Sequence, residues 1–370
     1  MNDKIKDTVS DKLDPRTVIV VLIVAIVEFE LFSLSRGVVL AAGRDAWLSI
    51  LLGSLLLSFT TYLLVSLAAR FPRENLFQYS GKVWGKPLSY VIAISYFIFW
   101  AGYLTIMFKN SMEANRVFFL NKTPVIIPLI LMAIGAVWLV SYGLPAITRF
   151  FQLMFPFLIL PILLIQILSI KNVKIDSFFP IMANGFLPVL KGAFVYFGVI
   201  QSLEVLLFLS PFLTDVKKSL KPSLIGINIV NLIALSQVVT AVGILGVKST
   251  KELIWPNASM LGYLEVPGLP IERFGMLLTL PWLVAVFTTI CLVLYLLSYG
   301  IIQVFNFRNK KAVIYIASGI SVLATFFIPN FAWSMEIRNI INVLTWGAIF
   351  IIPVLTLIVA ILRGKVEYQP

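Results

Sequence analysis

The sequence predicts an all-α protein that crosses a membrane several times. Of its 370 residues, 60% are hydrophobic and 12% are Asp, Glu, Lys or Arg, whereas soluble domains contain about 45–50% apolar and about 25% charged residues. So few charges cannot cover the surface of a water-soluble fold. The composition also excludes a disordered chain, which has low hydrophobicity and high net charge, and an outer-membrane barrel, whose strands alternate polar and apolar residues.

Ten apolar runs divide the chain, each close to the roughly 20 residues that a helix needs to cross a bilayer. They are residues 17–41, 46–69, 87–109, 124–141, 146–170, 186–210, 221–246, 274–303, 312–329 and 339–362. The polar residues 1–15 are typical of a cytoplasmic tail and not of a signal peptide, because no cleavage site follows a short apolar core. We expect one transmembrane domain over 16–362 and a second cytoplasmic tail over 363–370.

The distribution of Lys and Arg places both tails in the cytoplasm. With the amino terminus inside, the inner segments hold 17 of the 29 basic residues, and cytoplasmic loops carry an excess of such residues. Basic loops that face anionic membrane lipid then explain the net charge of +12, without a nucleic-acid partner. On the outer side, the connection 247–273 is long enough to form short helices over an outer vestibule.

Missing residue types exclude several kinds of functional site. The chain has no His, so His-based zinc sites and Ser-His-Asp triads are impossible. Its single Cys, Cys291, provides no disulfide framework. Neither Gly-x-Gly nor GxxxxGK(S/T) occurs, which removes the dinucleotide and phosphate-binding fingerprints. We expect no enzyme activity, no catalytic residue, no metal site and no cofactor.

Ionisable residues inside the spans indicate function, because each costs about 2.5 kcal/mol or more at the bilayer centre unless it is paired or hydrated. The acids within the predicted spans are Glu28 and Glu30 in the first and Glu204 in the sixth. On a continuous helix, Glu28 and Glu30 would point about 200° apart. Local unwinding over residues 29–35 would let both reach the interior of the bundle.

The sixth span has a similar interruption signal in Gly198, Gln201 and Ser202. The first and sixth spans begin two five-span halves, and corresponding interruptions in two halves are typical of inverted-repeat transporters, which bind substrate near the membrane midplane. Structural roles explain these residues as well. Glu204 can pair with a basic residue, Gly198 can allow close helix packing, and Arg36 can extend to the outer headgroups.

Short motifs spread over nearly the whole length give the chain a resemblance to a known family. They are Asp45-Ala46-Trp47, Arg70-Phe71-Pro72, Gly143-Leu144-Pro145-Ala146-Ile147-Thr148-Arg149, Glu204-Val205-Leu206-Leu207-Phe208-Leu209-Ser210-Pro211, Trp255-Pro256, Ile271-Glu272-Arg273 and Trp282. In this order and spacing, on a ten-span chain, they resemble the spore germination permease-like proteins, the B subunits of nutrient germinant receptors. Two departures stand out. Phe32-Ser33 replaces the Gly common at the first-span break, and Phe274-Gly275 follows the Glu-Arg pair where an Asp is common.

The resemblance implies a fold of the amino acid–polyamine–organocation superfamily (LeuT-like, five plus five inverted helices, with the first and sixth broken) in the spore inner membrane. It implies a small germinant, often an amino acid, and two partners, an A subunit and a C lipoprotein. The ligand is expected between the broken helices, with the third and eighth alongside. The candidate ligand-binding residues are Glu28, Glu30, Phe32, Ser33, Leu34, Ser35, Tyr103, Thr105, Phe197, Gly198, Gln201, Ser202 and Glu204. A bulky Phe32 would narrow this pocket.

Three functions remain open at this point. A germinant sensor would change between two conformations when ligand binds at the helix breaks. A secondary transporter would use Glu28, Glu30 or Glu204 to carry a coupling proton. An ion channel opened by germinant would pass cations along the few polar side chains of the spans.

Overall fold

The chain folds into a bundle of helices in the computed structural model, which describes residues 12–27, 30–118, 124–260 and 271–366. The described part contains no β-strand, and one isolated backbone bridge joins Leu13 to Leu213. Its α-helices are α1 (Thr17–Ile26), α2 (Glu30–Ala42), α3 (Ala46–Arg70), α4 (Leu76–Trp84), α5 (Lys86–Phe118), α6 (Ile126–Val140), α7 (Leu144–Ile170), α8 (Phe186–Val199), α9 (Leu206–Leu209), α10 (Leu220–Glu252), α11 (Pro256–Ser259), α12 (Ile271–Phe305), α13 (Lys310–Phe326), α14 (Phe331–Thr345) and α15 (Ile352–Leu362).

Six helical segments of the described chain are long and apolar enough to cross a membrane, and a bent pair of shorter helices makes a seventh. The bent pair is Phe186–Val199 with Leu203–Phe212. Two further apolar helices of 10–17 residues are Thr17–Ile26 and Ile126–Val140. The protein is therefore an integral membrane protein of all-helical fold. The ten-span, five-plus-five arrangement stays a prediction.

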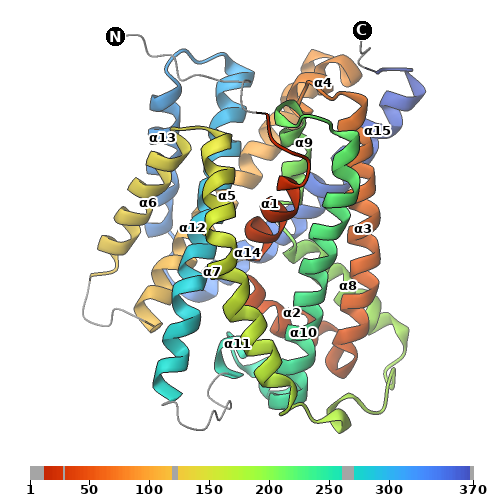
Figure 1. Ribbon diagram of the computed structural model, residues 1–370, viewed down its shortest axis with the longest axis vertical. Coiled ribbons are helices and arrows are strands. Elements are labelled where there is room, and N and C mark those ends of the chain that lie inside the picture. Colours follow the sequence, from red (N-terminus) through yellow and green to blue (C-terminus); the bar gives the residue numbers. More distant parts are fainter. Residues whose placement is uncertain (1–11, 28–29, 119–123, 261–270, 367–370) are drawn as a thin grey trace.

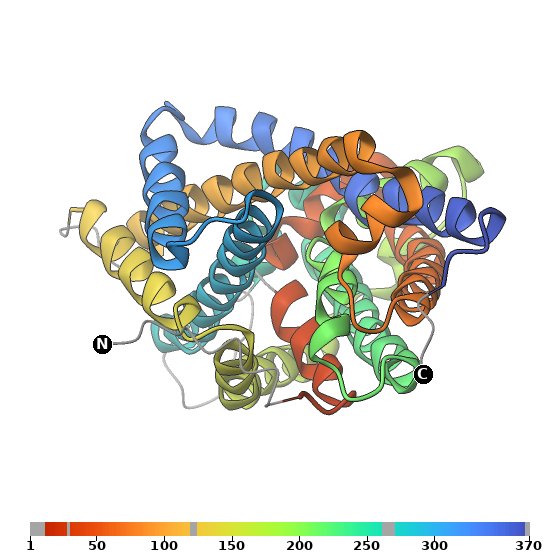
Figure 2. The ribbon, with the colours of Figure 1, turned by 90° about the horizontal axis from the view of Figure 1, so that it is seen from above.

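The long helices lie side by side in Figure 1, and Figure 2 shows the same bundle from above. In both views α6 and α13 lie at one side of the bundle, whereas α3 and α10 lie at the other. In the apolar stretch of α12, 78% of the residues are buried, against 17% in that of α7. Helix α12 is therefore a central element, and α7 presents most of its side chains to the surroundings.

The first apolar run is divided into two helices. Helix α1 ends at Ile26 and α2 begins at Glu30. Most of the segment predicted to be unwound, 29–35, is therefore helical and belongs to α2. Ser33 and Ser35 therefore lie inside α2. Their hydroxyls contact other helices instead of freed backbone groups: that of Ser35 donates to the carbonyl oxygen of Gln237 at 3.3 Å. Val27 itself, with φ −77° and ψ 78°, has left the helical conformation, so α1 ends before it.

The sixth apolar run is interrupted between Val199 and Leu203. Helix α8 ends at Val199, a 3-10 turn covers Leu203–Val205, and α9 follows at an angle of 54°. Ser202 lies in the interruption with a φ of 70°, a left-handed conformation that is uncommon for residues with a side chain. The backbone groups freed here face the bundle interior, because Ile200, Gln201 and Ser202 are all buried.

Two predicted spans are longer than their apolar runs. Helix α5 continues past residue 109 to Phe118, and α14 begins at Phe331 and not at 339. A six-residue π-helical turn, Trp346–Ile351, then joins α14 to α15. In the predicted outer connection, α10 extends to Glu252 and α11 is a short helix, while residues 261–270 lie outside the described part. These extensions bring charged residues into the bundle.

Candidate functional site

Three polar side chains of α14 face the interior of the bundle. Ser334, Arg338 and Asn342 are four residues apart, which places them in one row along a helix face. The Ser334 hydroxyl donates to Oδ1 of Asn110 on α5 at 3.2 Å. One turn further along, Nη1 of Arg338 donates to the Ser33 hydroxyl of α2 at 3.1 Å. Helix α14 thus contacts both α5 and the beginning of α2.

The third member of the row contacts the interrupted sixth run. Nε2 of Gln201 donates to Oδ1 of Asn342 at 2.9 Å. A Cβ atom added at Gly198 would lie 2.8 Å from the carbonyl oxygen of Asn342, so the end of α8 approaches the α14 backbone as closely as only glycine allows. One face of α14 therefore contacts both α2, at Ser33, and the α8–α9 interruption, at Gln201.

Several buried polar atoms at this place have no hydrogen-bond partner among the described residues. They are Oε1 of Gln201, the hydroxyl of Ser202 and Nδ2 of Asn110. Most buried polar groups in proteins are hydrogen-bonded, so such atoms need a water molecule or a ligand. Two of the three, on Gln201 and Ser202, lie in the interruption itself. The interruption is therefore a candidate site for a small polar molecule.

Glu204 follows the interruption and is fully buried. Nε1 of Trp100 on α5 donates to its Oε1 at 2.9 Å, while Oε2 has no partner among the described residues. Trp100 belongs to an aromatic cluster with Tyr96, Phe77 and Phe208, in which ring centroids lie 5.0–5.9 Å apart. The carboxylate is thus held at the edge of a rigid group of rings from α4, α5 and α9.

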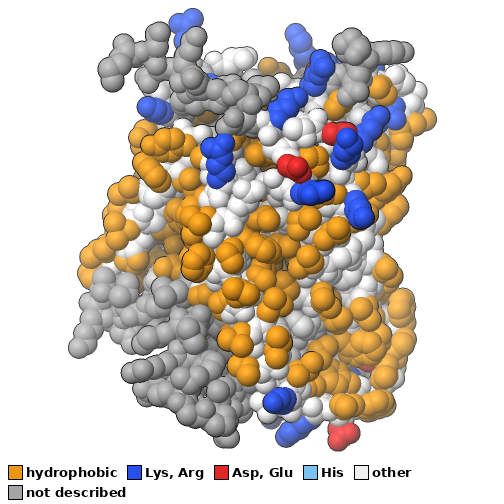
Figure 3. All heavy atoms as spheres, viewed as in Figure 1, with side chains coloured by type: hydrophobic (Ala, Val, Ile, Leu, Met, Phe, Trp, Pro, Cys, Tyr) orange, Lys and Arg blue, Asp and Glu red, His pale blue; other side chains and the backbone are white. Residues whose placement is uncertain are grey.

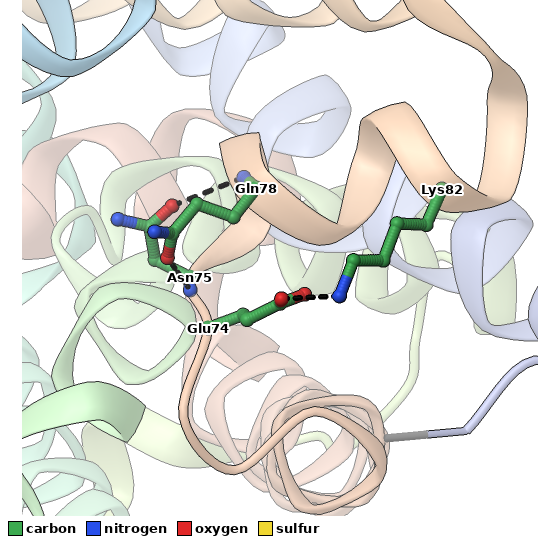
Figure 4. A network of polar contacts seen from close by, with 4 residues as sticks. All are labelled: Glu74, Asn75, Gln78 and Lys82. Atoms are coloured by element: carbon green, nitrogen blue, oxygen red, sulfur yellow. Dashed lines mark hydrogen bonds and ion pairs between the residues drawn. The ribbon is translucent and has the colours of Figure 1, made fainter. Parts of the chain in front are cut away.

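Helix α4 is fixed at its start by a capping box (Figure 4). The Asn75 side chain accepts from the backbone N–H of Gln78 at 3.3 Å, and Oε1 of Gln78 accepts from the backbone N–H of Asn75 at 2.9 Å. This reciprocal pairing satisfies two of the amides that a helix start leaves without partners. Lys82 forms an ion pair with Glu74 on the same segment.

The start of α4 also contacts segments that follow the interruption. The Ser210 hydroxyl, just after α9, donates to the carbonyl oxygen of Glu74 at 2.7 Å. Nδ2 of Asn75 donates to Oε1 of Gln303 near the end of α12 at 2.6 Å. These two hydrogen bonds join the start of α4 to the segment after α9 and to α12.

The structure places the other predicted residues as follows. Phe197 stacks on Trp346 at 3.9 Å between ring centroids, and Leu34 is buried in the apolar core. Tyr103 is buried beside Phe99, while the Thr105 hydroxyl donates to the carbonyl oxygen of Ala101 on its own helix at 2.8 Å.

The predicted acids of the first run are not all described. Glu28 lies outside the described residues, as do the side chains of Glu30 and Phe32. The predicted residues that lie together at the α8–α9 interruption are Gly198, Gln201 and Ser202. Ser33 contacts the same helix, α14, one turn away at Arg338.

Sequence reasoning missed Asn110, Arg338 and Asn342. The predicted spans ended at 109 and began at 339 because charged residues interrupt the apolar runs there. Lys109 in fact forms a mostly buried ion pair with Glu113 at 3.2 Å. A row of polar residues at intervals of four, Ser334, Arg338 and Asn342, is the sequence signal that indicates an inward helix face.

The arrangement of helices matches that of solved membrane transporters. A Na+-coupled sialic acid symporter superposes with a TM-score of 0.66 at 13% identity, covering 92% of this chain and 78% of the symporter. Mhp1, a nucleobase-cation-symport-1 family transporter, superposes with a TM-score of 0.63 at 12% identity, covering 99% and 82%. The chain therefore has the fold of these solved transporters.

The family is defined more closely by sequence. Residues 12–333 match the family model described as "Spore germination protein". Spore germination protein A2 of Bacillus subtilis (strain 168) is 23% identical over 91% of this chain and 92% of its own length. Spore germination protein KB of the same organism is 27% identical, with 79% of each chain covered. This chain belongs to the spore germination protein family, as its motifs predicted.

Proposed function

We propose that this protein is the B subunit of a nutrient germinant receptor, which binds a small nutrient, an amino acid above all, at the α8–α9 interruption. Binding would shift the bundle between two conformations and so trigger germination. The observation that carries the proposal is the group of buried polar atoms on Gln201 and Ser202 that lack partners among the described residues. These two residues follow α8, and Gln201 contacts α14. Spore germination proteins A2, B2 and KB are relatives over 79–91% of this chain.

The proposal includes the setting of the protein. The chain would form ten spans as two inverted halves of five, with broken first and sixth spans, in the spore inner membrane and with both termini in the cytoplasm. It would act with an A subunit and a C lipoprotein. The bend of 54° between α8 and α9 and the separation of α1 from α2 support the two broken spans.

A germination screen tests this function. Spores of a strain that lacks the gene are compared with wild-type spores on individual amino acids and sugars, and we expect one nutrient response to be lost and to return with the gene. If the deletion strain responds to every nutrient as the wild type does, the proposed function is wrong.

A proton- or cation-coupled amino-acid transporter is the second candidate. Glu204 favours it, since a fully buried carboxylate with one oxygen lacking a partner in the described chain is a suitable proton carrier. Uptake of radiolabelled amino acids into proteoliposomes separates the two functions. Accumulation driven by an ion gradient indicates a transporter, whereas saturable binding without accumulation indicates a sensor.

A further inference from the structure

Three lysines surround a shallow groove at the start of α10. The groove has a volume of about 540 Å³. It is lined by basic and apolar side chains, chiefly those of Lys217, Lys218, Lys221, Leu220, Leu224 and Ile225. In Figure 3 the basic side chains at this end of the visible face lie above a broad apolar belt. The groove therefore lies at the border between the charged end of the bundle and its apolar side.

The charge of the groove is positive. Asp215 neutralises one of the lysines: its Oδ2 lies 3.4 Å from Nζ of Lys218, and its Oδ1 accepts from the backbone N–H of Lys217 at 3.0 Å. Lys217 and Lys221 form no ion pair within the described part of the chain. Both are exposed, and both line the same groove. A phosphate group between them would be held by two positive charges.

An apolar stripe of α10 continues from the lysines along the bundle. Ile225, Ile229 and Leu232 follow Lys221 at intervals of three or four residues, which places all of them on one helix face. They are 41%, 37% and 66% exposed. An apolar stripe that begins at a group of lysines matches a phospholipid, in which an acyl chain continues from a charged headgroup.

The apolar side chains favour a lipid over other anions. Free phosphate would contact the lysines and leave Leu224, Ile225 and the stripe uncovered. An acidic segment of a soluble protein would have to cover an apolar surface at the level of the membrane. Lysines next to a membrane span attract anionic lipid headgroups, and the acyl chain of the same molecule would cover the stripe.

We propose that this groove binds an anionic phospholipid, with its phosphate between Lys217 and Lys221 and an acyl chain along Ile225, Ile229 and Leu232. The inference assigns a lipid to a defined site and is independent of the nutrient at the α8–α9 interruption. Because the segment between α9 and α10 leads from the interruption to this groove, the lipid would hold the start of α10 at the level of the headgroups.

Fluorescence quenching by brominated lipids tests the inference. In a Cys291→Ala background, Ile229→Cys in the full-length protein is labelled with bimane and reconstituted into phosphatidylcholine vesicles that contain brominated phosphatidylglycerol or brominated phosphatidylcholine. We expect phosphatidylglycerol to be preferred at this position roughly fivefold or more, the change in lipid affinity that one lysine near the surface produces. Leu323→Cys is the control position: it is 63% exposed on α13 and should show no preference. Equal quenching by the two lipids at Ile229→Cys overturns the inference.

Two pairs of substitutions test the role of the lysines. Lys217→Gln with Lys221→Gln should abolish the preference at Ile229→Cys. Lys82→Gln with Lys86→Gln is the matched control, because it removes two exposed lysines that are also four residues apart, at the α4–α5 connection, and should leave the preference unchanged. A preference that survives the first pair, or is lost equally with the second, would show that the groove does not select the lipid.

Inorganic phosphate separates a lipid site from a site for a free anion. Added at constant ionic strength, it should leave the lipid preference unchanged, and displacement of phosphatidylglycerol by phosphate would overturn the assignment to a lipid. The comparison of Ile229→Cys with Leu323→Cys decides the question even if the lysine variants do not fold. None of these results depends on whether the protein binds a nutrient.

Discussion

Gly198 lies where the end of α8 meets the backbone of α14. An added Cβ would lie 2.8 Å from the carbonyl oxygen of Asn342, and backbone atoms cannot turn aside as a flexible side chain can. Gly198→Ala should therefore separate α8 from α14, with a loss of about 1–3 kcal/mol of stability from overpacking. We expect spores with this variant to need a higher nutrient concentration for the same germination rate, while the amount of protein in the membrane stays comparable.

The control for this prediction is Gly319→Ala. Gly319 also lies in a helix, α13, but a Cβ there would meet no atom within 4 Å. Replacing a helical glycine by alanine in open space stabilises a helix by about 0.5–1 kcal/mol. Gly319→Ala spores should germinate as the wild type does. Equal responses of the two variants would show that contact between Gly198 and α14 is unimportant for sensing.

The hydrogen bond from Trp100 to Glu204 gives a second prediction for single residues. Trp100→Phe keeps an aromatic ring in the cluster but removes the donor to a fully buried carboxylate, 2.9 Å away in the wild type. Leaving a buried acceptor without a partner costs about 1–3 kcal/mol, so the unfolding midpoint in detergent should fall. Glu204→Gln should lower it less, since the amide oxygen can accept the same N–H. A larger loss for Glu204→Gln would indicate that the negative charge itself stabilises the fold.

At the scale of elements, the start of α4 joins three parts of the bundle. Asn75 caps α4, and its Nδ2 atom binds Gln303 of α12 at 2.6 Å. Asn75→Ala removes both contacts, and the loss of a helix cap alone costs about 0.5–2 kcal/mol. We expect a lower unfolding midpoint in detergent.

Lys82→Ala is the control for this prediction. It removes only an ion pair whose lysine is 54% exposed, and such surface pairs contribute about 0–1 kcal/mol. A smaller fall for Asn75→Ala than for Lys82→Ala would contradict this account.

The helix ranges show what hydropathy can and cannot predict. The run 144–170 is uninterrupted by charge after Arg149, and the predicted span 146–170 is close to α7, Leu144–Ile170. Helix α14 was predicted to begin eight residues late because Glu336 and Arg338 end the apolar run. When spans are predicted from hydropathy, a charged residue marks the end of a span. Only the folded bundle shows that Ser33 accepts a hydrogen bond from Arg338 there.

The candidate site also contains residues that the sequence predicted and residues that it did not. Gly198, Gln201 and Ser202 were predicted because a glycine and polar side chains inside an apolar run are a local signal of interruption. Asn342 was not predicted, because its spacing of four residues from Arg338 and Ser334 is a signal only once α14 is known to begin at Phe331. Asn342 and its partner Gln201 are 141 residues apart in sequence. Placing it requires the packing of α14 against α8, which depends on the whole bundle.

For the molecule as a whole, charge is distributed unevenly along the bundle. In Figure 3, Lys and Arg side chains gather at the upper end of the visible face, where α10 begins, and a broad apolar belt lies below them. The three lysines of this region, Lys217, Lys218 and Lys221, surround a shallow groove with Leu220 and Leu224. Because cytoplasmic loops are enriched in basic residues, this end should face the cytoplasm.

Cysteine labelling in intact cells tests this orientation, and the chain suits the method because its one cysteine, Cys291, is buried. In a Cys291→Ala background, Lys174→Cys and Lys218→Cys each place one thiol at an exposed lysine position. Lys174 follows α7 and Lys218 precedes α10, on opposite sides of the membrane if the sixth run crosses it. A membrane-impermeant maleimide should label Lys174→Cys in intact cells and Lys218→Cys only after permeabilisation. The reverse pattern would invert the topology, and labelling of both in intact cells would show that the α8–α9 segment does not cross the membrane.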